Sequence, residues 1–172
     1  MVYRFRIVLD TLDEVFRDIE IEDTATLEDL HNATTQAFGF DGTEMASFYL
    51  SDEDWNQGEE IVLFDMNEGA NPVRMMNETA LDTVVSESQT KLIYVYDFFD
   101  MWTFYVELAD IAEPKDGRDY PNLMYSHGHL PDSPPEKKFE AEKLDDFEDD
   151  FKEDFDDNID FDSLDDFDQN WN

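Results

Sequence analysis

Residues 91–108, KLIYVYDFFDMWTFYVEL, constrain the fold more than any other part of the chain. Apolar side chains fall on both faces of residues 92–96, which is typical of a strand buried in the middle of a sheet. From Trp102 to Leu108, large apolar residues alternate with more polar ones, as they do in a half-buried strand. Residues 97–100 separate the two runs, so the segment predicts a β-hairpin.

The N-terminal part of the chain predicts a second hairpin and then a helix. Residues 2–9 and 15–21 alternate in polarity as strands do. Thr26, with Asp29 three residues later, is close to a capping box, and Gly39 supplies a helix stop. The expected buried stripe of this helix consists of Leu27, Leu30, Thr34, Ala37 and Phe38.

Three shorter segments complete the expected elements. Residues 47–52 and 61–65 predict further strands, and residues 80–85 predict a short helix or turn. A hairpin followed by a capped helix that crosses one sheet face is the opening of a β-grasp, or ubiquitin-like, arrangement. We therefore predict an α+β fold with a mixed, mostly antiparallel sheet and one main crossing helix.

Three of these segments together resemble the plasmid pRiA4b open-reading-frame-three-like family, which is related to passenger proteins of insertion elements. The segments are VFRDIEI (15–21), TLEDLHNATTQAFGFDG (26–42) and YVYDFFDMWTFYVEL (94–108). The second is similar to the family's Thr-Leu-x-x-Leu-His and Ala-Phe-Gly-Trp stretches. The resemblance covers roughly residues 1–112. It implies an α+β domain whose biochemical role is largely undefined and brings no established catalytic residues.

The chain departs from the family pattern at positions that could matter for metal binding. Phe99 stands where the family has Gly, Phe104 where it has His, and Glu44-Met45 where a His-Leu pair is common. If members of the family bind a metal through His and Asp, this chain lacks most of the imidazoles. It also contains no cysteine. We expect no metal and no cofactor.

Asp97 and Asp100 are the candidate catalytic carboxylates because they bracket the predicted turn beside Trp102. They could face Arg4 or Arg17 inside a cleft, or they could bond the turn backbone, which is the commoner use of Asp in turns. With His31 as the nearest credible imidazole, they would form the site of a small metal-dependent hydrolase. That enzyme is the alternative to a non-catalytic role, which the residues favour.

The three histidines give little support to an enzyme. His31 is expected at the edge of the helix's buried stripe, where a structural or surface role is favoured over catalysis. His127 and His129 could be half of a metal site, but they lie in a stretch rich in Pro and Gly. Such a stretch does not preorganise ligands, so we interpret the pair as loop residues.

The net charge of −35 restricts the partners that this chain could bind. Direct binding of nucleic acid needs a basic footprint, so we expect none. A basic protein or a nucleic-acid-binding protein is the plausible partner, and solubility alone is an equal explanation. No apolar stretch approaches the length of a membrane span, and residues 1–10 lack the apolar core of a signal peptide. We therefore expect a monomer in the cytoplasm that does not contact the membrane.

Residues 136–172 differ in composition from the rest of the chain. We expect a domain over residues 1–112, an irregular ending over 113–135 and a disordered tail over 136–172. The tail contains 17 Asp and Glu against 4 Lys, so it cannot bury enough apolar surface to fold by itself. An EF-hand loop starting at Asp156 is excluded because Phe161 and Phe167 occupy the positions that need Gly and Glu.

The tail nevertheless keeps large apolar residues at helical spacing. We interpret them as anchors for a basic partner, with the carboxylates steering its approach. Mimicry of DNA charge, docking on the chain's own domain, simple solubilisation and adaptation to salt are the alternatives. The predicted partner-binding residues form two stripes, Leu144, Phe147, Phe151, Phe155 and Ile159, and then Leu164, Phe167 and Trp171.

Overall fold

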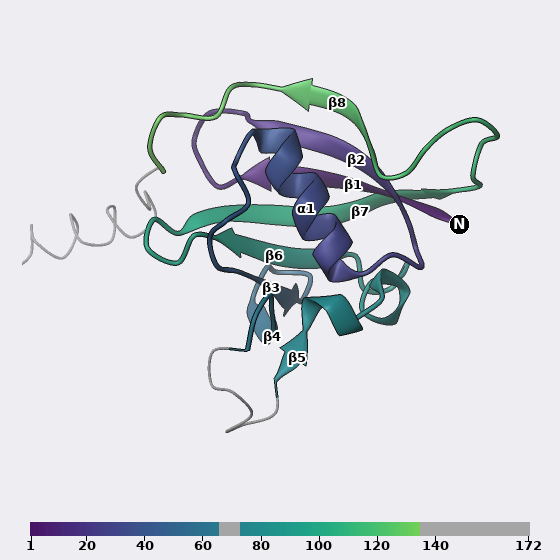
Figure 1. Ribbon diagram of the computed structural model, residues 1–172, viewed down its shortest axis with the longest axis horizontal. Coiled ribbons are helices and arrows are strands. Elements are labelled where there is room, and N and C mark those ends of the chain that lie inside the picture. The colour runs from purple at the N-terminus through teal and green to yellow at the C-terminus, as the bar shows by residue number, and fades with distance from the viewer. Residues whose placement is uncertain (66–72, 135–172) are drawn as a thin grey trace, which may run out of the picture. The chain divides into compact units, whose positions relative to one another are not determined.

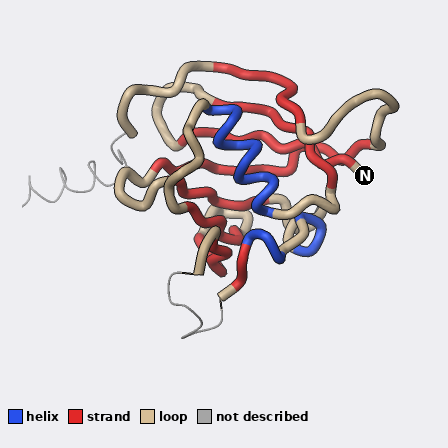
Figure 2. Tube along the Cα trace, viewed as in Figure 1, coloured by secondary structure: helices blue, strands red, loops and turns tan. Residues whose placement is uncertain are grey.

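The structure is a computed structural model that describes residues 1–65 and 73–134. These residues form an α+β fold in which a long sheet carries one α-helix across one face (Figure 1). Figure 2 shows how the strands lie side by side behind the helix. The elements are β1 (Val2–Leu9), β2 (Phe16–Glu22), α1 (Leu27–Phe38), β3 (Ala46–Ser51), β4 (Gln57–Val62), β5 (Arg74–Met75), the 3-10 helices η1 (Met76–Glu78) and η2 (Leu81–Thr83), β6 (Lys91–Tyr96), β7 (Trp102–Ala112) and β8 (Asn122–His127).

The eight strands pair in the order β5-β4-β3-β6-β7-β1-β2-β8. All neighbouring pairs are antiparallel except β4 and β5. The two predicted hairpins are present as β1–β2 and β6–β7, and they meet because β1 also pairs with β7. β6 lies between β3 and β7 near the middle of the sheet, as its apolar faces predict. The predicted α+β class and mostly antiparallel sheet are confirmed.

Helix α1 begins and ends where its caps predict. The Thr26 hydroxyl accepts from the Asp29 amide, and the Asp29 carboxylate accepts from the Thr26 amide, which completes the capping box. Gly39 adopts a left-handed conformation with φ +86°, and its N–H donates to carbonyls of the last turn. The buried face of α1 consists of Leu27, Leu30, His31, Thr34, Thr35 and Phe38.

Aromatic rings from α1 and the sheet interlock in the core. The Phe38 and Phe104 ring centroids lie 4.7 Å apart, and those of Phe48 and Tyr94 also lie 4.7 Å apart. Phe104, which stands where the family has His, is fully buried. Burying a side chain of this size stabilises the fold by about 2–3 kcal/mol. The departure at Phe104 is therefore explained by packing.

Three strands differ from the sequence prediction, and one of them, the short parallel strand β5, was not predicted at all. β4 begins at Gln57 rather than at residue 61, because backbone pairing with β3 includes a polar stretch that shows no apolar alternation. β8 lies inside residues 113–135, which were predicted to be irregular. It pairs antiparallel with β2, and the register of this pairing shifts between Asp18 and Ile19. Most β8 side chains are exposed, so this edge strand leaves no period-two pattern. In the described part of the chain, no helix is long and apolar enough to cross a membrane.

Candidate functional site

His31 is buried rather than at the edge of the helix. Its side chain is 2% exposed, and Nδ1 lies 2.6 Å from the Tyr94 hydroxyl on β6. Burial lowers the pKa of His31 to about 4, so the imidazole is neutral near pH 7. Burial likewise raises the pKa of Tyr94 well above its ordinary value. The pair therefore joins α1 to the sheet by a neutral hydrogen bond and is not accessible to a substrate.

Asp41 and Tyr96 form a polar cluster beside His31. The Asp41 carboxylate accepts hydrogen bonds from the Thr43 amide at 3.1 Å, the Thr43 hydroxyl at 2.9 Å and the Tyr96 hydroxyl at 3.0 Å. These bonds, with the Thr43 backbone first, lower the pKa of Asp41. The Tyr96 oxygen also accepts from the Gly42 amide at 3.1 Å. The Thr43 bonds are exposed and the Tyr96 bonds are partly buried, and together they fix the loop after α1.

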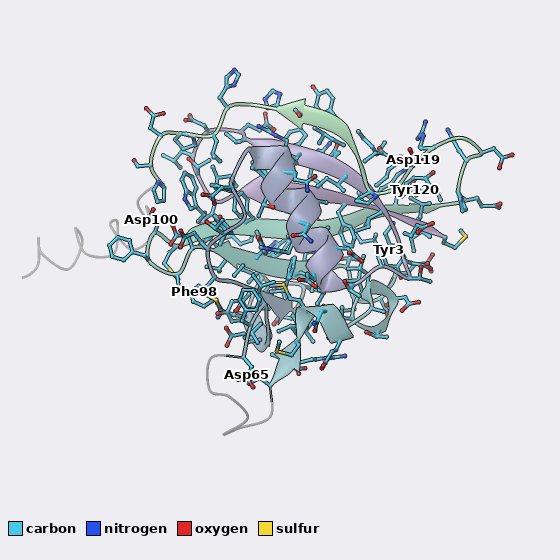
Figure 3. All side chains as sticks on the ribbon, in the orientation of Figure 1. Tyr3, Asp65, Phe98, Asp100, Asp119 and Tyr120 are labelled. Carbon is cyan, nitrogen blue, oxygen red and sulfur yellow. The ribbon has the colours of Figure 1, made fainter. Side chains whose placement is uncertain are left out.

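Asp97 and Asp100 do not form a catalytic pair with an arginine. Asp97 Oδ1 accepts from the amides of Phe99 at 3.1 Å and Asp100 at 3.3 Å, so the carboxylate closes the β6–β7 turn. Asp100 is exposed at the end of the turn (Figure 3). The interpretation of Asp97 as a turn carboxylate agrees with this geometry. His31, which is in the interior, does not join the two carboxylates on the surface.

The two arginines considered as partners of these carboxylates bind elsewhere. The Arg4 guanidinium bonds Glu20 and Asp110 at 2.9 Å and 3.0 Å. Arg17 is 8% exposed and donates to three backbone carbonyls, which belong to Phe16, Ala37 and His127. Arg17 thereby ties β2 to α1 and to β8, and its role is structural.

Glu20 is a buried carboxylate that the sequence interpretation did not single out. Its side chain is 1% exposed and accepts from Arg4 and Arg118, each at 2.9 Å. Burial acts to raise the pKa of Glu20, but hydrogen bonds from Arg4, Asn122 and Arg118 outweigh it, and the pKa is lowered. Arg4 and Glu20 lie opposite each other in the predicted hairpin, so the sequence could have indicated this pair. Arg118 comes from a distant loop, so the sequence could not have indicated its bond to Glu20.

His127 and His129 lie on either side of a glycine that approaches the backbone closely. The His127 ring stacks on Phe16 at 5.2 Å between centroids, and its Nε2 lies 3.6 Å from a Glu14 carboxylate oxygen. A Cβ on Gly128 would lie 2.5 Å from the Glu14 carbonyl oxygen. His129 is exposed. Across residues 1–65 and 73–134, no group of three or more His, Cys, Asp or Glu could hold a metal ion.

A small pocket lies between α1, β2 and the start of β8. It has a volume of about 160 Å³ and is lined mainly by Ile19, Ala33, Ala37, Pro121 and Leu123. This volume is well below that of typical small-molecule sites, which begin at about 300 Å³. Three other pockets, with volumes of about 290, 290 and 270 Å³, have polar or mixed linings, and none of these four contains His31, Asp97 or Asp100.

Large apolar side chains are exposed at the β6–β7 turn. Phe99 is 93% exposed, and Phe98 and Met101 flank it at 41% each. The sequence prediction treated this segment only as a turn with two carboxylates. The signal for the exposed ring was the Phe at a position where the family has Gly. The predicted partner-binding residues from Leu144 to Trp171 lie outside the described residues.

Comparisons with known proteins give a family and a fold. The sequence pattern of the family described as "Plasmid pRiA4b ORF-3-like protein" matches residues 1–170, well beyond the expected 1–112. A crystal structure of a protein of unknown function from Methanosarcina mazei Go1 superposes with a TM-score of 0.68 at 20% identity, covering 84% of this chain and 79% of that chain. No curated protein matches. The chain belongs to the plasmid pRiA4b ORF-3-like family.

Proposed function

We propose that this protein is a non-catalytic interaction module whose acidic and aromatic segment 136–172 engages a basic protein partner. The observation that carries the proposal is the spacing of the apolar residues in that segment. Leu144, Phe147, Phe151 and Phe155 step by three and four residues, which would place them on one face of a helix formed on binding. The segment has a net charge of −13, so a cationic groove would both neutralise it and receive its rings.

The described residues support a non-catalytic role. The carboxylate of Asp97 accepts hydrogen bonds from the backbone of its own turn, and His31 is hydrogen-bonded to Tyr94 in the core. The hydrolase alternative needs three residues together, but Asp97 and Asp100 lie in a surface turn and His31 lies in the interior. No specific observation favours that alternative. A nucleic-acid-binding protein is one class of basic partner that an acidic segment of this kind would occupy, as a mimic of DNA charge.

The experiment compares proteins retained from a native lysate by the full chain and by residues 1–135. All described elements lie within residues 1–134, so the shorter chain keeps every strand and the helix. We expect the full chain to retain a basic protein that residues 1–135 do not retain. Elution of that protein by moderate salt would reflect the screening of the carboxylates. Identical retained proteins for the two chains would contradict the proposed role of the segment.

A further inference from the structure

We propose that the described domain carries a second docking surface, which binds a cationic amphipathic segment of a protein. The surface is the turn patch, defined as the four exposed apolar residues of two sheet turns. Phe99 and Leu12 are 93% and 76% exposed, and Phe98 and Met101 are 41% exposed each. Exposed apolar residues are ordinary when scattered singly, but a group of them marks an interaction site.

The two turns lie at the same end of the sheet. Leu12 belongs to the β1–β2 turn, and the other three residues belong to the β6–β7 turn. β1 and β7 are neighbouring strands, and the pairing continues past Leu9, where the Asp10 amide donates to the Thr103 carbonyl at 2.9 Å. Both turns therefore emerge beside each other at this end of the sheet (Figure 1). In Figure 3 the same end is marked by Phe98 and Asp100.

The β6–β7 turn holds its aromatic residues in a fixed backbone conformation. Asp97 donates its amide to the Met45 carbonyl at 2.7 Å while its carboxylate accepts from the Phe99 and Asp100 amides. The Thr103 hydroxyl donates to the Met101 carbonyl at 3.0 Å. Asp97 and Met101 adopt left-handed φ values of +66° and +60°. A non-glycine residue in this conformation is strained, so the surrounding hydrogen bonds must maintain the turn.

A rigid turn favours binding through Phe99. An anchor that is already held in place loses less conformational entropy when a partner binds. Aromatic anchors near the centre of an interface contribute a large share of the binding energy. Phe99, at the position that is Gly in the family pattern, is the most exposed Phe among the described residues. The hydrogen bonds of the turn do not need this ring, because a smaller side chain would leave them intact.

The charge around the patch determines the occupant. Residues 10–14 and 97–101 contain five carboxylates and no Lys or Arg, namely Asp10, Asp13, Glu14, Asp97 and Asp100. Apolar anchors surrounded by carboxylates are complementary to an apolar side chain flanked by Lys or Arg. A second copy of this chain would bring the same carboxylates, and segment 136–172 has a net charge of −13, so both would be repelled. The complementary occupant is a cationic amphipathic segment of another protein.

The turn patch is independent of the proposed role of segment 136–172. The patch lies in the described domain, and the segment follows that domain in the chain. Substitutions in one leave the residues of the other unchanged. Loss of one role can therefore be measured while the other is intact.

The test uses the full isotope-labelled chain and two synthetic peptides. The first peptide is an amphipathic helix of Lys and Leu, and the second has the same length and charge with Ser in place of Leu. Backbone amide signals are followed for the natural chain, for Phe99→Ser and for the control Leu123→Ser, and the affinity is taken from the titration of residues 10–14 and 97–101. Leu123 is 49% exposed on β8 and follows Tyr120, which Figure 3 shows at the end of the molecule away from Phe98.

We expect the Lys–Leu peptide to shift the amide signals of residues 10–14 and 97–101. Phe99→Ser should weaken its binding about tenfold, as loss of an aromatic anchor does. Leu123→Ser should leave the affinity unchanged, and the Lys–Ser peptide should bind both variants and the natural chain equally. Equal weakening by the two substitutions, or signal changes confined to residues 136–172, would overturn the proposal. A thermal unfolding midpoint equal to that of the natural chain would show that Phe99→Ser leaves the fold intact.

Discussion

The imidazole Nδ1 of His31 and the hydroxyl oxygen of Tyr94 lie 2.6 Å apart in the interior, between α1 and the middle of the sheet. The two residues are separated by 63 positions in the sequence, so this bond forms only when the helix has docked on β6. Because His31 is neutral in the folded protein and titrates normally when unfolded, the pair makes the stability of the fold depend on pH.

Acidification should destabilise the fold through His31. Its folded pKa of about 4 is below the ordinary value of 6.5, so the unfolded state binds the proton more tightly. The contribution of His31 is present above pH 6.5 and is lost as pH falls towards 4. We expect a loss of about 2 kcal/mol in the free energy of unfolding between about pH 7.5 and about pH 5. Urea denaturation at the two pH values measures it.

Two substitutions separate this effect from the general acid response. His31→Asn keeps a polar group near the Tyr94 hydroxyl but cannot titrate in this range, so its pH-dependent loss should be smaller by about 2 kcal/mol. Tyr94→Phe removes the hydroxyl and leaves His31 buried, so it should lower stability at both pH values and keep the pH dependence. An unchanged pH dependence in His31→Asn would show that the imidazole is not the titrating group.

Glu20 should contribute far more to stability than Asp110, although both bond Arg4. Glu20 is 1% exposed and accepts from two arginines, whereas the Asp110 side chain is 57% exposed. Glu20→Gln would leave two guanidinium groups facing a neutral amide and should cost about 2–3 kcal/mol. Asp110→Asn should cost less than about 0.5 kcal/mol. Chemical denaturation near neutral pH measures both, and similar costs would contradict the assigned burial of Glu20.

Gly128 should tolerate a methyl group less well than Gly117. Both glycines have left-handed φ, +81° and +80°. A Cβ on Gly128 would meet the Glu14 carbonyl oxygen at 2.5 Å and Val15 Cα at 3.0 Å, whereas a Cβ on Gly117 would meet nothing within 4 Å. Gly117→Ala should therefore cost only the backbone strain, about 1 kcal/mol, and Gly128→Ala should cost clearly more. Thermal unfolding of the two variants compares them, and equal shifts would show that β8 can move away.

The parts of the fold that were predicted correctly depend on local signals. The ends of α1 are determined by the caps Thr26, Asp29 and Gly39, each of which bonds within one turn of the helix. The apolar alternation of residues 2–9 is likewise independent of which strand lies beside it. β8 had no such signal because it pairs through its backbone while Leu123, Met124 and Tyr125 remain exposed. Its place in the sheet depends on a distant strand, β2.

The burial of His31 could not be predicted for a related reason. A polar residue next to the apolar stripe of a helix is usually exposed, because burying an unsatisfied imidazole is costly. The hydroxyl that satisfies it comes from Tyr94, whose alternation pattern indicated only a buried strand. The exposure of Phe99 was missed, although its position in the predicted turn indicated it, because aromatic residues are ordinarily interpreted as core.

The helical spacing of the apolar residues in segment 136–172 leads to a prediction about individual side chains. In an α-helix, Phe139 would lie about 120–160° around the axis from Leu144, Phe151 and Phe155, because successive residues are about 100° apart. A partner that binds the apolar face should therefore contact Phe151 and Phe155 and not Phe139. Neutralising two nearby carboxylates with Asp150→Asn and Asp154→Asn should weaken binding less than removing the two rings.

The most direct test measures the dissociation constant of the basic protein that the full chain retains from the lysate. It compares the natural chain with a double Phe→Ala variant, the paired Asp→Asn variant and Phe139→Ala. Phe151→Ala combined with Phe155→Ala should weaken binding at least about tenfold, as the loss of buried aromatic anchors does. The paired Asp→Asn variant should lose less, and Phe139→Ala should bind like the natural chain. Greater loss from the Asp→Asn variant than from the double Phe→Ala variant, or equal loss from Phe139→Ala, would contradict anchoring by an aromatic helical face.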